Sequence, residues 1–397
     1  MSVAQILAPA SEAEAAAMIA AARQAKTPLS IEGGGTRAGL GRPTQAAATL
    51  STRALTGITL YEPAEMVIAA RAGTPLRVIE ETLAGKGQML PFEPADARAL
   101  YGGTGEPTIG AVAACNVSGP RRIQAGAARD SLIGVRLVNG MGEAIKSGGR
   151  VVKNVTGLDL VKLNCGAHGT LGLLTEVTFK VLPRPDDSAT LVLHGLDDAR
   201  AVAAMSAALG SPFEVSGAAH LPAGLAGGAA LTLLRLENFT ASVAYRLAAL
   251  RQALAAFGAS DALPEHEAAR LWTDIRDARF FAAPSAQAVW RVSAPPSRAP
   301  ALVEAFARKI ATRHFYDWGG GLVWLSCGAA GGAGASILRA ALAGQGHATL
   351  ARAPDALRAA IDVFEPLAAP VMQLTKGIKA SFDPDRLLNP GRMYAGV

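Results

Sequence analysis

The sequence predicts an α+β protein that is divided into two or three domains. Its 397 residues exceed the size of one ordinary domain, and the 50% of hydrophobic residues suffice for a sizeable core. Three glycine-rich blocks fall within the first 183 residues, whereas strand-like and helical segments alternate after residue 186 in an Ala- and Leu-rich chain. We therefore expect an N-terminal domain of mixed strands and helices, followed by a separate α+β domain with an antiparallel sheet.

The N-terminal region begins with a helix and a strand that lead into the first glycine block. Ser11 and Glu14 form a capping box, so we expect a helix to residue 25 and a strand over residues 28–31. Bare main-chain amides in the block that follows, IEGGGTRAGLG at residues 31–41, can hold a phosphate. A flexible surface turn is the alternative. No helix pattern follows, so the block is neither a Rossmann loop nor a P-loop, and it joins two strands.

The next segment predicts a helix between two strands. Residues 66–71 and 88–92 have strand character. Between them Thr74 is expected as the N-cap, Pro75 as the first helical residue and Gly85 as the end of the helix.

Two further glycine-rich blocks occupy residues 102–126 and 165–183. Residues 135–145 lie between them and predict a β-hairpin around the sequence NGMG. The third block ends in alternating apolar and polar residues, from which we expect an edge or half-buried strand.

The chain after residue 186 predicts the second domain. Strands are expected at residues 190–193, 230–236, 288–292 and 321–326, and helices at 197–209, 240–257, 299–312 and 333–343. The resulting domain division is 1–185, 186–365 and 366–397. The last segment is polar and carries the turn-forming sequences Asp-Pro and Asn-Pro-Gly.

Composition excludes several classes of protein. The net charge is +6, but the 29 Arg and 9 Lys are scattered and aromatics are only 5%, which does not favour nucleic-acid binding. Cys115, Cys165 and Cys327 form no C-x-x-C motif, so we expect no iron–sulfur ligand set in this chain. The first residues lack a signal-peptide pattern, and we expect a cytoplasmic protein that reaches the inner face of a membrane only through its partners.

The order of glycine blocks, distinct domain and terminal NPGR resembles the flavin-binding family of vanillyl-alcohol oxidase type. The segment TIGAVAACNVSGPRRIQAGAARDSLIGVRLVNGMGEAIKSGGRVVKNVTGLDL, residues 108–160, is similar to the FAD-binding E subunits of bacterial glycolate oxidases. The resemblance implies a PCMH-type FAD-binding domain of two α+β subdomains, plus an α+β cap domain with an antiparallel sheet. It also implies that residues 366–397 return to the FAD domain.

The same resemblance implies which residues bind FAD. Gly33, Gly34, Gly35 and Thr36 would wrap the pyrophosphate, with Arg37 beside them. The other implied FAD contacts are Thr108, Ile109, Gly110, Asn116, Ser118, Gly119, Gly126, Arg129, Asp130, Gly169, Thr170, Leu171 and Gly172. Some family members tether FAD through a His in the phosphate loop, but here Arg37 follows Gly-Gly-Gly-Thr and no His is near, so we predict noncovalent FAD. We interpret His168 as a structural loop residue, with contact to the cofactor as the alternative.

The implied activity is the oxidation of glycolate or D-lactate, with electrons passed through FAD to an iron–sulfur partner subunit. A sister FAD-binding subunit is the other implied partner, and a flavin relay without its own oxidation chemistry is the alternative. Candidate catalytic residues are Arg291, Arg392 and Lys376, since a cation must hold the substrate carboxylate. The six His residues do not pair at ligand spacing, so we predict no metal site. The absence of a strand–GxGxxG–helix unit speaks against a nicotinamide cofactor.

Overall fold

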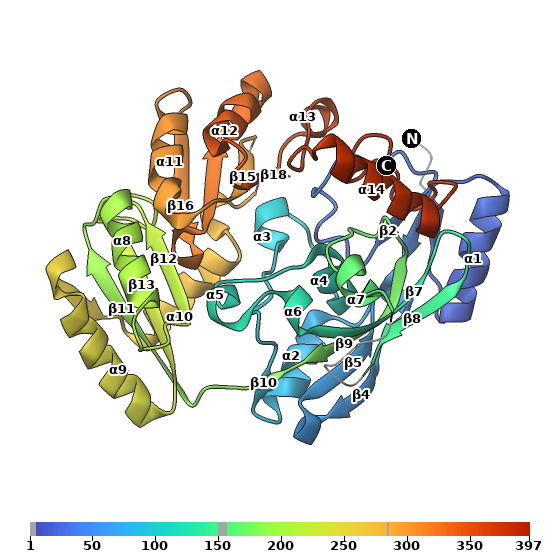
Figure 1. Cartoon of the computed structure of the whole chain (residues 1–397). Helices are drawn as coiled ribbons and strands as arrows, with labels where there is room; N and C mark the ends of the chain where they lie inside the picture. The colour runs from blue at the N-terminus through green and yellow to red at the C-terminus, as the bar shows by residue number, and fades with distance from the viewer. Residues whose placement is uncertain (1–4, 150–156, 284–285) are drawn as a thin grey trace.

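The structure is a computed structural model that describes residues 5–149, 157–283 and 286–397. Two bodies lie side by side and are joined through β10 (Leu182–Pro183), as Figure 1 shows. The N-terminal domain holds the elements before β10, and the second domain holds those from β11 (Asp187–His194) to β18 (His347–Arg352). Residues 153–156 of the KNVTG motif lie outside the described residues.

The N-terminal domain contains two sheets. The first is parallel, in the order β1 (Gln5–Leu7), β3 (Ala48–Ser51), β2 (Leu29–Glu32). The second is antiparallel, in the order β4 (Ile58–Glu62), β5 (Val67–Arg71), β9 (Leu173–Lys180), β7 (Leu132–Val138), β8 (Ala144–Gly148). A short pair joins β10 to β6 (Gln88–Met89). Each main sheet has its own buried apolar cluster, so the domain is built from two subdomains.

Helices of the N-terminal domain cover these sheets. They are α1 (Glu12–Gln24), α2 (Leu76–Ala84), α3 (Arg98–Tyr101), α4 (Ile109–Cys115), α5 (Arg122–Ala125), α6 (Ala128–Ser131) and α7 (Leu160–Asn164). The predicted helix at residues 11–25 is confirmed as α1, whose N-cap Ser11 accepts a hydrogen bond from the Glu14 amide. The β7–β8 hairpin and the β2-to-β3 connection through the first glycine block are also confirmed.

Two predictions for this domain are wrong in detail. Thr74 does not cap α2: its hydroxyl donates to the carbonyl of Arg71, and Pro75 takes the N-cap position. β9 is a central strand rather than an edge strand, because it pairs with both β5 and β7. Thr178 is therefore buried although it is polar. The alternation of apolar and polar residues within β9 does not show that another strand pairs with it on each side.

The second domain is one antiparallel sheet of eight strands with helices on both faces. The order is β14 (Ser260–Ala262), β11, β13 (Leu231–Asn238), β12 (Gly217–Leu221), β16 (Thr312–Asp317), β17 (Leu322–Cys327), β15 (Ala288–Ser293), β18. Its helices are α8 (Asp198–Leu209), α9 (Thr240–Ala253), α10 (Glu265–Arg276), α11 (Ala299–Ala307) and α12 (Ala335–Leu342). The predicted antiparallel sheet is confirmed, whereas the helix expected over 299–312 ends at Ala307 because Thr312 already pairs with Cys327.

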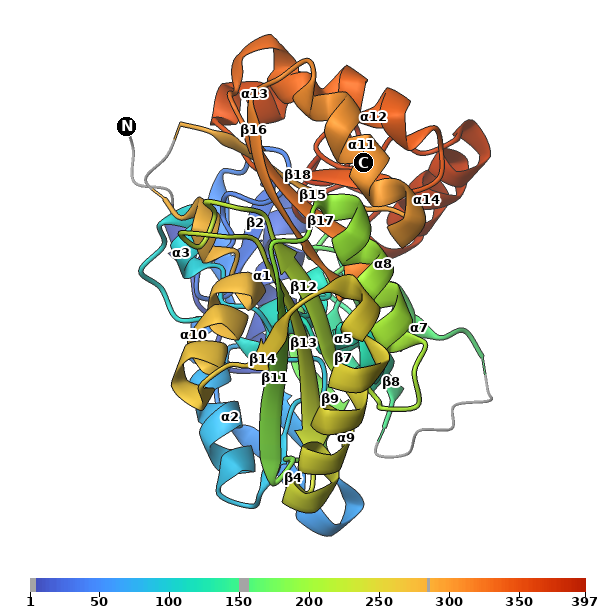
Figure 2. The same cartoon turned by 90° about the vertical axis from the view of Figure 1, so that its left-hand side faces the viewer.

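Both faces of the eight-stranded sheet are buried. One face packs against α8, α9, α11 and α12, and α10 lies on the opposite face (Figure 2). Leu100 of the N-terminal domain joins the cluster on the α10 face, so the two domains share apolar packing.

The chain end returns to the N-terminal domain through α13 (Asp355–Ala360) and α14 (Ala369–Phe382). Leu388 bridges to Leu29 of β2, and the buried Lys379 donates to the carbonyls of Thr170 and Leu388. The last 30 residues thereby tie the first and third glycine blocks together.

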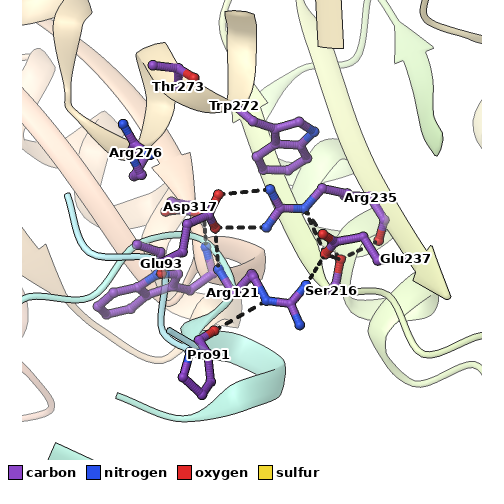
Figure 3. Close-up of polar contacts among 12 residues, drawn as sticks. Pro91, Glu93, Arg121, Ser216, Arg235, Glu237, Trp272, Thr273, Arg276 and Asp317 are labelled. Atoms are coloured by element: carbon purple, nitrogen blue, oxygen red, sulfur yellow. Dashed lines mark hydrogen bonds and ion pairs between the residues drawn. The ribbon is translucent and has the colours of Figure 1, made fainter. Parts of the chain in front are cut away.

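Four charged residues form a ring that joins the two domains (Figure 3); three ion pairs between side chains are closed by the backbone amide of Arg121, which donates to Glu93 at 3.2 Å. Arg121 and Glu93 come from the N-terminal domain, and Arg235 and Glu237 come from β13. Arg235 donates to both carboxylate oxygens of Glu93 at 3.0 and 2.9 Å and lies 3.2 Å from Glu237, which also pairs with Arg121. Burial would raise the pKa of Glu93, but the adjacent Arg235 holds it below its usual value.

We predict that Arg235→Met will lower the free energy of unfolding by about 3–5 kcal/mol, because it leaves the buried Glu93 without its ion-pair partner, while Glu237 keeps only Arg121. Urea unfolding followed by circular dichroism measures this loss. Arg77→Met is the matched control: Arg77 and Glu81 are both 62% exposed, so that change should cost less than about 0.5 kcal/mol. Equal losses for the two variants would contradict the structural importance of the ring.

Candidate functional site

The three glycine blocks meet at one cavity, here called the loop cavity. Its lining includes Gly33–Arg37 from the first block, Gly110 from the second, and Gly169 and Gly172 from the third. Arg392 of the chain end completes the wall. The structure thus brings together main-chain segments that are far apart in the sequence.

Glycine is required here because the loops pack back to back. A Cβ on Gly34 would lie 1.6 Å from the carbonyl oxygen of Glu106, and one on Gly105 would lie 1.8 Å from that of Gly34. A Cβ on Gly33 would lie 2.3 Å from the hydroxyl of Thr108. Gly35 has φ of 76°, a conformation that side chains disfavour. Glycine at these positions thus lets the loops touch one another and also leaves the cavity accessible.

Positive charge surrounds these loops. The guanidinium of Arg53 donates to the carbonyls of Gly33 and Gly34 at 3.3 and 3.2 Å. Arg37 donates to the carbonyl of Ala95, and Arg392 donates to the carbonyl of Arg37. Within the described ranges neither Arg37 nor Arg392 forms an ion pair with a carboxylate, so their charge remains available to an anion in the cavity.

Several residues predicted to bind the cofactor instead support the glycine-rich loops on the side away from the loop cavity. Thr108 caps α4 through a hydrogen bond from the Ala111 amide, and Ile109 belongs to the core. Thr170 and Leu171 are buried in the third block, where the Thr170 hydroxyl donates to the carbonyl of Ala167. These four residues fix the shape of the loops and are absent from the cavity lining.

Four other predicted residues lie away from both cavities. Asp130 accepts the Ala127 amide at the start of α6, and Gly126 has its φ of 81° in the preceding turn. Arg129 is exposed, and its backbone amide donates to Asn116. Lys376 is exposed on α14, so the structure does not bring this catalytic candidate to the others.

A second cavity, here called the interdomain cavity, has a volume of about 450 Å³ and is walled by both domains. It shares the wall residues Arg37, Cys115 and His168 with the loop cavity, so the two cavities are adjacent. The predicted residues Asn116, Ser118, Gly119 and Arg291 line it. Arg392 lines the loop cavity, so of the catalytic candidates Arg291 alone reaches the domain boundary.

Further functional side chains line the interdomain cavity. Arg122 and Trp324 lie here as the sequence allowed, the first as a residue that could face the flavin or a partner and the second as one that could shape a pocket. Tyr101, Cys115 and Asp317 were not predicted, because nothing in the local sequence shows that they converge. Burial raises the pKa of the Cys115 thiol, so the thiol stays protonated.

His168 lies in the walls of both cavities, a position that allows the alternative of contact with the cofactor beside its interpretation as a structural loop residue. Its backbone has φ of 53°. Burial lowers its pKa to about 3, and the nearby Arg392 and Arg37 contribute to that shift. The imidazole is therefore neutral at physiological pH.

Within the described ranges no group of three or more His, Cys, Asp or Glu side chains is arranged to hold a metal ion. The helices described are all too short or too polar to span a bilayer.

Comparisons with known proteins agree with this geometry. A family described as FAD binding domain matches residues 3–148. The glycolate oxidase subunit GlcE of Escherichia coli (strain K12) is 37% identical over 372 residues, which cover 93% of this chain and 93% of that protein. A D-lactate dehydrogenase of Archaeoglobus fulgidus is 27% identical over 189 residues, 47% of this chain and 41% of that protein.

The fold matches solved flavoprotein structures. The 4-ethylphenol oxidase from Gulosibacter chungangensis superimposes with a TM-score of 0.73 and 14% sequence identity, covering 98% of this chain and 89% of that chain. The PCMH-type FAD-binding fold with an α+β second domain, expected from the sequence, is thereby confirmed.

We predict that Gly34→Ala will weaken FAD binding by about 10-fold or more, the equivalent of one charge-assisted hydrogen bond, because the new methyl group forces the loops apart. Fluorescence titration of the FAD-free protein with FAD measures the dissociation constant. Gly377→Ala is the control, since nothing lies within 4 Å of a Cβ at that position. An unchanged FAD affinity in Gly34→Ala would show that these loops do not set the cofactor site.

Proposed function

The chain belongs to the family of the glycolate oxidase subunit GlcE, and we propose from this premise that it oxidises a small 2-hydroxy acid, glycolate or D-lactate, between its two domains. It is an FAD-dependent oxidoreductase of the hydroxy-acid class. The observation that carries the proposal is the common wall of the loop cavity and the charged interdomain cavity, formed by Arg37, Cys115 and His168. A cofactor held by the glycine blocks would therefore lie beside the charged groups at the domain boundary.

The residues around the loop cavity fit FAD. In our proposal the amides of Gly33–Arg37 face the two charges of the pyrophosphate, and Arg37 and Arg392 supply the compensating positive charge. Gly110, Gly169 and Gly172 let main chain approach the cofactor closely. When bound there, FAD would supply a two-electron acceptor for the oxidation of the hydroxy acid to a 2-oxo acid.

We also propose that the reduced cofactor delivers its electrons to an iron–sulfur partner subunit, alongside a sister FAD-binding subunit. The relative GlcE is a glycolate oxidase subunit by name, which supports an assembly of several chains. A glycolate oxidase subunit GlcD of Bacillus subtilis is related to this chain at 27% identity over 188 residues. A sister chain of that kind would have a similar cofactor domain.

We predict that FAD is bound noncovalently, because Arg37 rather than a His follows Gly-Gly-Gly-Thr at residues 33–36, and the half-buried Cys115 thiol is protonated. Acid precipitation of the purified holoprotein should leave all of the flavin in the supernatant. Yellow colour that stays with the pellet would contradict this, and Cys115→Ser and His168→Ala would then identify the tether.

The activity predicts that anaerobic glycolate bleaches the visible flavin absorbance of the purified chain. Acetate is the matched control, since it carries the carboxylate but has no hydroxyl group to oxidise. Bleaching by glycolate alone supports oxidation within this chain. An unchanged spectrum in a protein with bound FAD would refute that and favour the relay function.

A further inference from the structure

Two arginines from different domains meet on one aromatic ring at the interdomain cavity. Arg122 lies at the start of α5 in the N-terminal domain, and Arg291 lies on β15 of the second domain. Their guanidinium carbons are 4.5 and 4.9 Å from the ring centroid of Trp318. Both arginines are half-buried and line the cavity, so two like charges share a poorly hydrated space.

Neither arginine has a protein partner for its charge. In the described part of the chain, Arg122 and Arg291 form no ion pair and donate no hydrogen bond, although Arg121, Arg235 and Arg276 nearby each pair with a carboxylate. Burial lowers the pKa of Arg291 to about 10, and the neighbouring charge of Arg122 adds to this shift. A structural arginine would have been expected to find an acid. These two retain their donors for a ligand in the cavity.

Trp318 is held in place by both domains. Its indole Nε1 donates to the carbonyl of Gly119 in the second glycine block at 3.0 Å. Its backbone has φ of 52°, a left-handed conformation that is rare for a bulky residue and costs about 1–3 kcal/mol. The indole ring of Trp318, on which the two arginines stack, is therefore held in a strained backbone conformation. Strained residues of this kind are common at functional sites.

The carboxyl group of Asp317 lies in the same cavity as the two arginines. Asp317 is 2% exposed, and one of its oxygens accepts the Trp318 amide at 2.7 Å. The other aspartates of the lining, Asp96 and Asp277, pair with Arg98 and Arg276. No such ion pair is recorded for Asp317 among the described residues.

The charges that face Asp317 come from both domains. They are Glu93, which disfavours its ionisation, and Arg235 and Arg291, which favour it. Burial is the largest influence and raises the pKa of Asp317 to about 7. A carboxylate with such a pKa is suited to accept a proton near neutral pH.

We propose that Arg122 and Arg291, stacked on Trp318, bind the carboxylate of the substrate, and that Asp317 accepts the proton of its 2-hydroxyl group. This assignment rests on the proposed function and adds the residues that select an α-hydroxy monocarboxylate. The O–H bond breaks with its proton passing to a carboxylate oxygen of Asp317, and the two electrons leave with the C2 hydrogen to bound FAD.

The arginines are tested by the binding of oxalate, a carboxylate that cannot be oxidised in this way. Isothermal titration calorimetry of the FAD-loaded protein should show about 10- to 100-fold weaker binding in Arg122→Met and in Arg291→Met, the loss of one charge-assisted interaction each. Arg313→Met is the matched control: Arg313 is exposed and stacks on Phe281 at 5.8 Å outside the cavity. Circular dichroism and the oxidised flavin spectrum verify that each variant is folded.

The outcomes separate this inference from the proposed function. Loss of oxalate binding in the two variants, with wild-type affinity in Arg313→Met, supports the anion site even if glycolate fails to reduce the flavin. Wild-type oxalate affinity in both variants, or no oxalate binding by the wild-type protein, overturns the site. Glycolate reduction with an unchanged KM in both variants would also overturn it while leaving the proposed function intact.

Asp317 is tested by the pH dependence of flavin reduction. In the wild-type protein the rate with glycolate should rise with pH and level off above about 7, since the protonated acid cannot accept the hydroxyl proton. Asp317→Asn should be slower by about 100-fold or more and should lose this pH dependence, while oxalate affinity changes little. An unchanged pH profile in Asp317→Asn would exclude Asp317 as the proton acceptor.

Discussion

The buried ring of Arg121, Glu237, Arg235 and Glu93 is the constraint on which the rest of this structure depends. Buried charges are tolerable only when their partners are fixed, and here each domain supplies one cation and one anion. Either domain alone would lose stability if it buried its cation and its anion without the partners that the other domain supplies. The ring therefore sets the separation of the domains, and with it the width of the cavity between them.

The same boundary contains paired and unpaired charges, and the contrast separates structure from function. The ring neutralises its own charges, as do Arg276 and Asp277 beside it. Arg122, Arg291 and Asp317 line the interdomain cavity, and none of them forms an ion pair with another described residue. A buried charge without an ion-pair partner lowers the stability of the fold. Three such groups at one cavity therefore indicate that they are present to bind a ligand rather than to stabilise the fold. Strain at Trp318 points to the same place.

The loop cavity is held together differently, because its walls are formed by backbone packed against backbone rather than by ion pairs between side chains. Gly34 and Gly105 pack main chain against main chain, so the loops can form a continuous wall. The chain end adds Arg392 to that wall and secures it through Lys379 and Asp383, which are buried together at 2.7 Å. A segment nearly 400 residues from the start is thus part of the first loop's environment.

The sequence by itself determined the local elements and the cofactor class. Helix α1, the β7–β8 hairpin and the three glycine blocks depend on neighbouring residues, and the family resemblance supplied FAD and the two-part fold. The tertiary structure alone decided that β9 is central, that Thr108 supports the loops while Asp130 lies away from the cavities, and that Arg122 and Asp317 line the same cavity as Arg291. Such groupings arise from the packing of distant segments, and no residue's immediate neighbours encode which remote charge will remain without a partner.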